Sequence, residues 1–216
     1  MGLFDSIKRQ ITSDIKSAAR SQTTRAVNGA VNSAVNSAVN TATKSGGSNK
    51  SVDIVFNTMP TSLADIKALK YADLKDPNGV AALVVVALNV YTQNRDEGIA
   101  MLNFLKGPNP LNPSEIQFIN NRFMDGKNYV PRSFFNGATP DNDYTPSAPY
   151  TIKVMENPYS RDQLNEGYLV LHLQSGGADS VRQVKLRTKP STGEWFLWEQ
   201  FLLSDIRQPK SADPWA

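Results

Sequence analysis

Residues 80–88 are nine consecutive apolar side chains, the longest such run in the chain. Asp76 and Pro77 stand just before the run and are typical of a helix start, so we expect a helix over residues 77–91. A helix that is apolar on every side must be covered on every side. At about 1.5 Å per residue it is also far too short to cross a bilayer. The run therefore predicts a buried central helix in one hydrophobic core.

Other helices are predicted around this one. Thr61 or Ser62 can cap a helix at residues 63–69, and Asn94 can cap one at residues 96–106. Asn112 followed by proline marks the start of a fourth helix, at residues 115–124. We therefore expect a region of four helices.

Strands are predicted on both sides of the helical region. One short strand precedes it at residues 52–56, and four follow it at residues 150–156, 167–174, 180–189 and 195–201. Gly- and Pro-rich turns between the last three favour an antiparallel meander. The fold class is thus α+β, a four-helix region followed by an antiparallel sheet of three to five strands, in one globular domain at residues 52–216.

A polar connection of more than twenty residues, 126–149, joins the helices to the sheet. Loops of this length are uncommon unless they are functional or mobile. Its aromatic residues either line a binding surface or pin the connection to the core, and pinning is favoured because aromatic side chains usually bury area. These residues are Tyr129, Phe134, Phe135 and Tyr144.

Basic charge is concentrated at the N-terminus. Residues 1–51 hold seven Lys/Arg and two Asp, a net charge of +5, whereas residues 52–216 hold sixteen Lys/Arg and eighteen Asp/Glu, a net charge of −2. We divide this region into an amphipathic, repetitive helical tail at 1–44 and a flexible Gly/Ser-containing linker at 45–51.

The start of the tail has the pattern of an amphipathic helix, which can lie on an anionic membrane or dock on a protein. The apolar contact residues are Leu3, Phe4, Ile7, Ile11 and Ile15, and the basic ones are Lys8, Arg9, Lys16 and Arg20. An Ala-Val-Asn repeat follows over residues 26–42. Its period of four drifts around a helix, so it serves as a spacer, as a membrane-induced helix or as a site of self-association.

The residues that most catalytic and metal sites need are scarce. The chain has no cysteine and one histidine, His172, which excludes thiolate metal sites, cysteine nucleophiles and disulfides. His172 lies mid-strand between two leucines, where a structural role is favoured over a general base. We predict no catalytic residues, no metal site and no cofactor.

One strand face combines cations with aromatic side chains, as a ligand or partner surface would. In the alternative interpretation, this strand face is simply exposed to solvent and the tryptophan side chains lie in the core. The net acidic domain makes nucleic acid an unfavourable partner. A tryptophan near the C-terminus can fill a groove of its own domain or anchor a partner. The candidate residues are His172, Lys185, Arg187, Trp195, Trp198 and Trp215.

Three blocks, residues 184–199, 203–209 and 212–216, resemble an uncharacterised bacterial domain family. The resemblance covers about the last third of the chain. It implies a bacterial cytoplasmic protein tied to the membrane, near membrane-stress and band-7-type scaffold proteins. It supplies no functional residues.

Three hypotheses about function follow. In the first, the chain is a non-enzymatic, cytoplasmic protein at the inner face of the cell membrane, and its tail binds an anionic membrane surface or a membrane-associated scaffold protein. In the second, the sheet face and the 126–149 connection form a small-molecule-binding or hydrolytic site. In the third, the Ala-Val-Asn repeat makes the chain an oligomerising interaction module.

Overall fold

Helix α3 (Pro77–Tyr91) lies at the centre of the domain, as the apolar run predicts. The side chain of Asp76 accepts a hydrogen bond from the backbone N–H of Asn78, with 3.0 Å between the heavy atoms, and this cap starts the helix. Thirteen of the fifteen residues of α3 are buried, from Gly79 to Tyr91. The helix is therefore enclosed on all sides.

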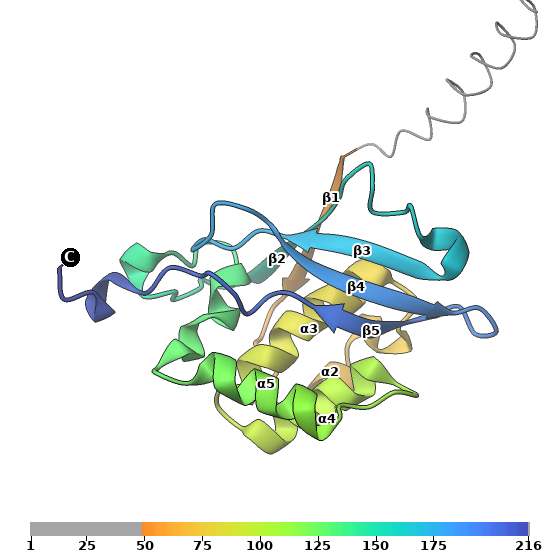
Figure 1. The fold of residues 1–216 in the computed structure, drawn as a ribbon, viewed down its shortest axis with the longest axis horizontal. Helices are drawn as coiled ribbons and strands as arrows, with labels where there is room; N and C mark the ends of the chain where they lie inside the picture. The colour runs from red at the N-terminus through yellow and green to blue at the C-terminus, as the bar shows by residue number, and fades with distance from the viewer. Residues whose placement is uncertain (1–48, 216) are drawn as a thin grey trace, which may run out of the picture. The chain divides into compact units, whose positions relative to one another are not determined.

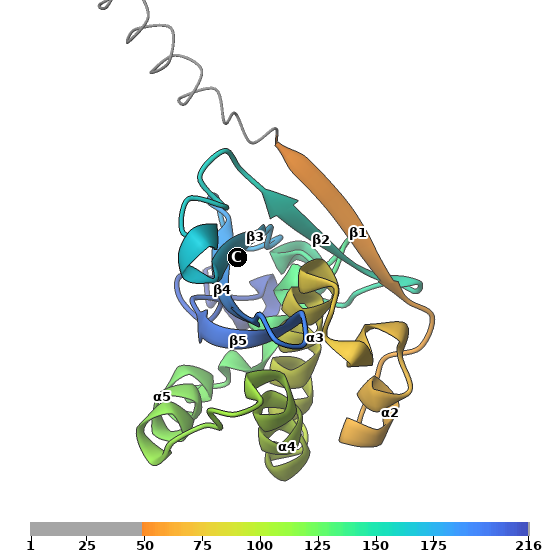
Figure 2. The same ribbon diagram turned by 90° about the vertical axis from the view of Figure 1, so that its right-hand side faces the viewer.

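A computed structural model describes residues 49–215 as two layers (Figure 1). In one layer, α2 (Leu63–Lys67), α4 (Arg95–Lys106) and α5 (Pro113–Phe123) accompany α3. The other layer is a five-stranded antiparallel sheet. Figures 1 and 2 show these helices on one side of the sheet, so among residues 49–215 no α-helix covers the opposite, outer face. The predicted α+β fold is confirmed.

The four helices start where the sequence predicts. Ser62, Asp76, Asn94 and Asn112 each occupy the N-cap, and each side chain accepts a hydrogen bond from a backbone N–H of the first turn. Helix α2 is shorter than predicted. It ends at Lys67 because Leu69 is extended, and a 3₁₀ helix follows at Lys70–Asp73.

The five strands lie in chain order, and the helical region is inserted between the first two. The strands are β1 (Lys50–Phe56), β2 (Tyr150–Glu156), β3 (Tyr168–Leu173), β4 (Arg182–Lys189) and β5 (Glu194–Gln200). Strand β1 begins two residues earlier than predicted because Lys50 and Ser51 pair with the end of β2. Strands β1 and β5 are the two edges of the sheet.

The sheet is split in its middle, and the long connection fills the gap. Strands β2 and β3 share only two residue pairs, while Phe135 pairs with Ile152 beside them. The ring of Tyr144, fully buried, stacks on that of Tyr129 with 5.2 Å between centroids. All four aromatic residues of the connection are buried, as the pinning interpretation requires.

The inner face of the sheet is apolar and packs on the helices. Leu169, Leu171, Leu173, Val184, Leu186 and Leu197 are buried there. Because strand side chains alternate, the residues between them lie on the outer face.

We predict that Gly98→Ala lowers the free energy of unfolding by about 1–3 kcal/mol, as overpacking of a tight contact does. A Cβ atom at Gly98 would lie 2.4 Å from Cα of Tyr91, so α3 and α4 would have to move apart. Urea unfolding followed by circular dichroism measures the change. Gln117→Ala, at an exposed position of α5, should stay within about 0.5 kcal/mol of the wild type. Equal effects of the two variants would contradict this account of the helix packing.

Candidate binding face and groove

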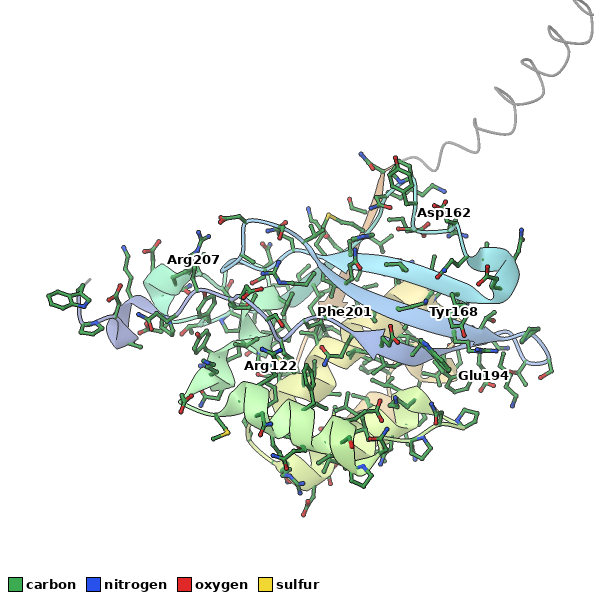
Figure 3. The ribbon with its side chains drawn as sticks, viewed as in Figure 1. Arg122, Asp162, Tyr168, Glu194, Phe201 and Arg207 are labelled. Carbon is green, nitrogen blue, oxygen red and sulfur yellow. The ribbon has the colours of Figure 1, made fainter. Side chains whose placement is uncertain are left out.

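Four side chains form a cation–aromatic cluster on the outer face, near the β4–β5 hairpin. This outer cluster consists of Tyr168, Lys185, Arg187 and Trp198. The rings of Tyr168 and Trp198 meet edge to face, with 5.6 Å between centroids. The guanidinium carbon of Arg187 lies 4.9 Å from the Tyr168 centroid and 5.1 Å from that of Trp198. Figure 3 places Tyr168 and Glu194 toward the hairpin end and Phe201 toward the other end of β5.

A β-bulge positions Trp198. Lys185 pairs with Glu199 and Leu186 pairs with Leu197, so Trp198 has no partner residue on β4. Bulges re-aim side chains at sheet edges. Here the bulge keeps Leu197 in the core and leaves Trp198 beside the outer cluster.

The cations of the outer cluster lie over rings and have no carboxylate partner. Nζ of Lys185 is 4.4 Å from the Tyr168 centroid, and Arg187 donates a hydrogen bond to the Tyr168 hydroxyl. Within residues 49–215, neither cation lies within 4.0 Å of a carboxylate oxygen. Glu199 is opposite Lys185 in the strand register without forming an ion pair. The positive charge on this face is therefore available to an anion.

A groove adjoins the outer cluster at the edge strand β5. This hairpin groove lies between the turn after α4 and the β4–β5 hairpin, and its volume is about 340 Å³. Arg187 and Trp198 belong both to the outer cluster and to the groove. The lining residues are Lys106, Pro108, Asn109, Arg187, Thr188, Lys189, Pro190, Phe196, Leu197 and Trp198.

An ion pair between a buried lysine and a partly exposed glutamate lies where this groove meets a second one. The side chain of Lys106 is 3% exposed, and its Nζ lies 2.7 Å from Oε1 of Glu115. Burial alone would raise the pKa of Glu115, but hydrogen bonds from Lys106 and from the backbone of Asn112 outweigh it and lower that pKa. The charge of Lys106 is thus already neutralised by a partner.

The second groove runs between α5 and β5 and is mainly apolar. This α5 groove has a volume of about 260 Å³ and shares Lys106, Leu197 and Trp198 with the hairpin groove. Phe118 and Phe201, on its two sides, are 43% and 53% exposed.

His172 is held in a hydrogen-bonded site away from the outer cluster. Its Nε2 is 3.3 Å from the side-chain amide nitrogens of Asn157 and Gln183, and its Nδ1 is 3.5 Å from Oγ of Ser160. Amide NH₂ groups only donate, so Nε2 accepts and the ring is neutral. Burial lowers the pKa of His172, and a hydrogen bond with the Met155 backbone opposes this in part. His172 also lines a cavity of about 370 Å³ beside Lys50.

The structure brings three of the six candidate face residues together and separates the others. Lys185, Arg187 and Trp198 meet in the outer cluster. Trp195 packs against the core and its backbone N–H donates to the carbonyl of Leu74, at 2.7 Å. Trp215 is 93% exposed, and the C-terminus lies at the opposite end of the domain from the β4–β5 hairpin (Figure 1). All the tail residues predicted to contact a membrane lie outside the described residues.

Several lining residues were not predicted as site residues. Strand alternation could have identified Tyr168, because it places this residue on the same face as His172. Alternation also places Lys189 on the same face as Arg187, which stands two residues earlier in the strand. No local pattern points to Lys106 or Asn109, because only the tertiary packing of α4 against the hairpin brings them into the groove.

Within the part of the chain that the structure describes, no group of three His, Cys, Asp or Glu side chains could hold a metal ion. No helix among the described residues has the length and apolar character needed to span a bilayer.

These features define a two-layer α+β domain whose one-sided sheet carries a cation–aromatic face. Residues 58–210 match a family described as a domain of unknown function (DUF6935), and the chain belongs to this family. The match confirms the resemblance to an uncharacterised family seen in the sequence. No curated protein matches the chain, and no solved structure does.

We predict that acid destabilises the domain through His172. Because its folded pKa lies below the ordinary value of 6.5, the unfolded chain binds the proton more readily. The stabilisation is complete above pH 6.5 and is lost as the pH falls toward the folded pKa. Urea unfolding at a series of pH values measures this slope. His172 is the only histidine, so His172→Gln should remove the slope, and a variant that kept it would refute the assignment.

Proposed function

We propose that this protein is a non-enzymatic peripheral protein that binds an anionic membrane surface through its N-terminal tail and the outer cluster of its domain. The outer cluster carries the proposal. Within the described residues 49–215, it combines two cations that form no ion pair with a carboxylate and two amphipathic aromatic rings, on a sheet face that no α-helix of this part of the chain covers.

The chemistry of the outer cluster suits the headgroup region of a membrane. Tyrosine and tryptophan place an apolar body beside a polar tip, and they are enriched at membrane–water interfaces. Lysine and arginine near an anionic leaflet contribute about 1 kcal/mol each. One cation pair is a weak attachment by itself, so a second contact is needed for stable association.

The tail is suited to supply that second contact. Its first sixteen residues combine bulky apolar residues at helical spacing with cations, and residues 1–51 carry a net charge of +5. The domain alone has a net charge of −2, so the tail dominates long-range attraction to an anionic surface.

The surroundings of His172 support binding over catalysis. Both of its ring nitrogens already face hydrogen-bonding partners, and burial keeps the ring neutral. A general base needs a free nitrogen within reach of a substrate proton. The second hypothesis is a small-molecule-binding or hydrolytic site formed by the sheet face and the 126–149 connection. The aromatic residues of that connection are buried, and the hairpin groove is lined by other residues.

We predict that the full chain sediments with vesicles of phosphatidylcholine and phosphatidylserine, and not with phosphatidylcholine alone. The triple variant Leu3→Ser, Phe4→Ser and Ile7→Ser should lose most of this binding, because it removes the apolar anchor. Co-sedimentation at several lipid concentrations measures the affinity.

A matched control changes the repeat instead. Replacing Val31, Val35 and Val39 by serine removes three apolar residues without touching the amphipathic start. This control should bind like the wild type. Binding that both triple variants retain in full would contradict the role of the tail, and equal loss in both would show that overall tail hydrophobicity is responsible.

The role of the outer cluster is tested by charge reversal. Lys185→Glu should weaken binding to the same vesicles roughly tenfold or more, since it replaces an attraction of about 1 kcal/mol with a repulsion. Lys127→Glu, in the connection after α5, changes the net charge equally and is the control. Added salt should reduce the difference between them. Indistinguishable affinities at low salt would show that the outer cluster does not meet the membrane.

A further inference from the structure

The floor of the hairpin groove is set by an unusually close approach of two segments. Gly107 ends α4 with φ of 56°, and a Cβ atom there would lie 2.3 Å from the ring of Phe196. Only glycine tolerates both the backbone conformation and this contact. The turn after α4 therefore lies directly against an aromatic ring, with Pro108 and Asn109 lining the space beside it.

Two cations line this space without a carboxylate partner. Arg187 and Lys189 are two residues apart on β4, so their side chains leave the same face of the strand. Neither is in an ion pair with a carboxylate among residues 49–215. Glu194 is opposite Lys189 in the register, but its carboxylate accepts a hydrogen bond from Thr192. Asn109 adds a carboxamide, whereas Lys106 is committed to Glu115.

The groove therefore offers two free positive charges beside aromatic surface. A phosphate monoester carries about 1.5 to 2 negative charges at neutral pH and three acceptor oxygens, and a carboxylate carries one charge. Guanidinium and ammonium groups are the side chains that recognise phosphate best. A volume of about 340 Å³ is near the lower limit of small-molecule pockets, which suits a ligand about the size of one ring with its phosphate.

We propose that the hairpin groove binds a small phosphate monoester carried on a flat ring or another apolar group. Arg187 and Lys189 hold the phosphate, and Phe196 and Trp198 contact the apolar part. This site goes beyond the association with an anionic membrane. It shares Arg187 and Trp198 with the outer cluster, whereas Lys189, Phe196 and Asn109 belong to the groove alone.

Two kinds of molecule carry such a phosphate monoester: a soluble phosphate ester, and phosphatidic acid in its lipid headgroup. Phenyl phosphate is the soluble probe, with phenol and inorganic phosphate as its two halves. Vesicles that contain phosphatidic acid are the lipid probe, compared with vesicles of equal charge that contain phosphatidylserine. Displacement from phosphatidic acid vesicles by phenyl phosphate assigns the lipid source, and binding of phenyl phosphate without a preference for phosphatidic acid assigns the soluble one.

The test is a titration of the full ¹⁵N-labelled chain with phenyl phosphate, followed by NMR. Saturable shifts are expected at residues 107–109, 187–189 and 196–198, with weaker binding of phenol and of inorganic phosphate. Arg187→Gln and Lys189→Gln should each weaken the affinity for phenyl phosphate roughly tenfold, as loss of one charge-assisted hydrogen bond does. Lys185→Gln, in the outer cluster but outside the groove, should leave this affinity unchanged.

Absence of saturable shifts would overturn the proposal. So would equal weakening by Lys185→Gln and Lys189→Gln, because it would mean attraction by general surface charge. The amide spectrum of each variant reports whether it is folded before the titration begins. Lys185→Glu separates the two proposals, since it should weaken vesicle binding roughly tenfold and retain phenyl phosphate binding.

Discussion

Helix α3 has no polar side, and this constraint determines how the rest of the domain is built. Each buried Val or Leu side chain contributes about 1.5–3 kcal/mol only if water is kept away from it. The inner face of the sheet covers one side of α3. Helix α4 packs against it so closely that Gly98 has no room for a side chain beside Tyr91. The connection at 126–149 closes the opening between β2 and β3 with its aromatic residues. Helices α2 to α5 therefore all lie on one face, and no α-helix of the described part of the chain covers the other face of the sheet.

The cations and aromatic rings of the outer face meet where β5 departs from regular pairing with β4. The bulge that releases Trp198 lets its ring meet Tyr168 and Arg187. The same strand is an edge, so the face continues around it into the two grooves. Between the grooves, the buried Lys106 is paired with Glu115, with 2.7 Å between Nζ and Oε1. Removal of either partner would leave a buried or half-buried charge unpaired, which is more costly than replacing both.

Most of the fold could be predicted from residues that are close together in the sequence. Helix starts depend on one capping side chain and its neighbours, and Ser62, Asp76, Asn94 and Asn112 all cap as predicted. Strand alternation assigned the leucines of β3 to the core and Arg187 to the outer face. The split between β2 and β3 could not be predicted, because Phe135 enters the sheet from a distant connection.

The candidate site was predictable only in its strand residues. Lys185 and Arg187 follow from the alternation of β4. The sequence did not separate Trp195, which packs against the core, from Trp198, because their surroundings depend on the strand register, on the bulge and on the contact with Leu74. The wall formed by Lys106 and Asn109 depends on where α4 ends relative to the hairpin, which is a property of the folded chain alone.

We propose that the outer cluster meets an anionic membrane while the core remains closed. Fluorine NMR of the full chain labelled with 5-fluorotryptophan tests it directly, with each of the three tryptophan signals assigned by a Trp→Phe variant. Vesicles containing phosphatidylserine and a spin-labelled lipid should broaden the signal of Trp198 and leave that of Trp195 sharp. A Trp198 signal that stays sharp while the chain is bound to the vesicles would contradict the account.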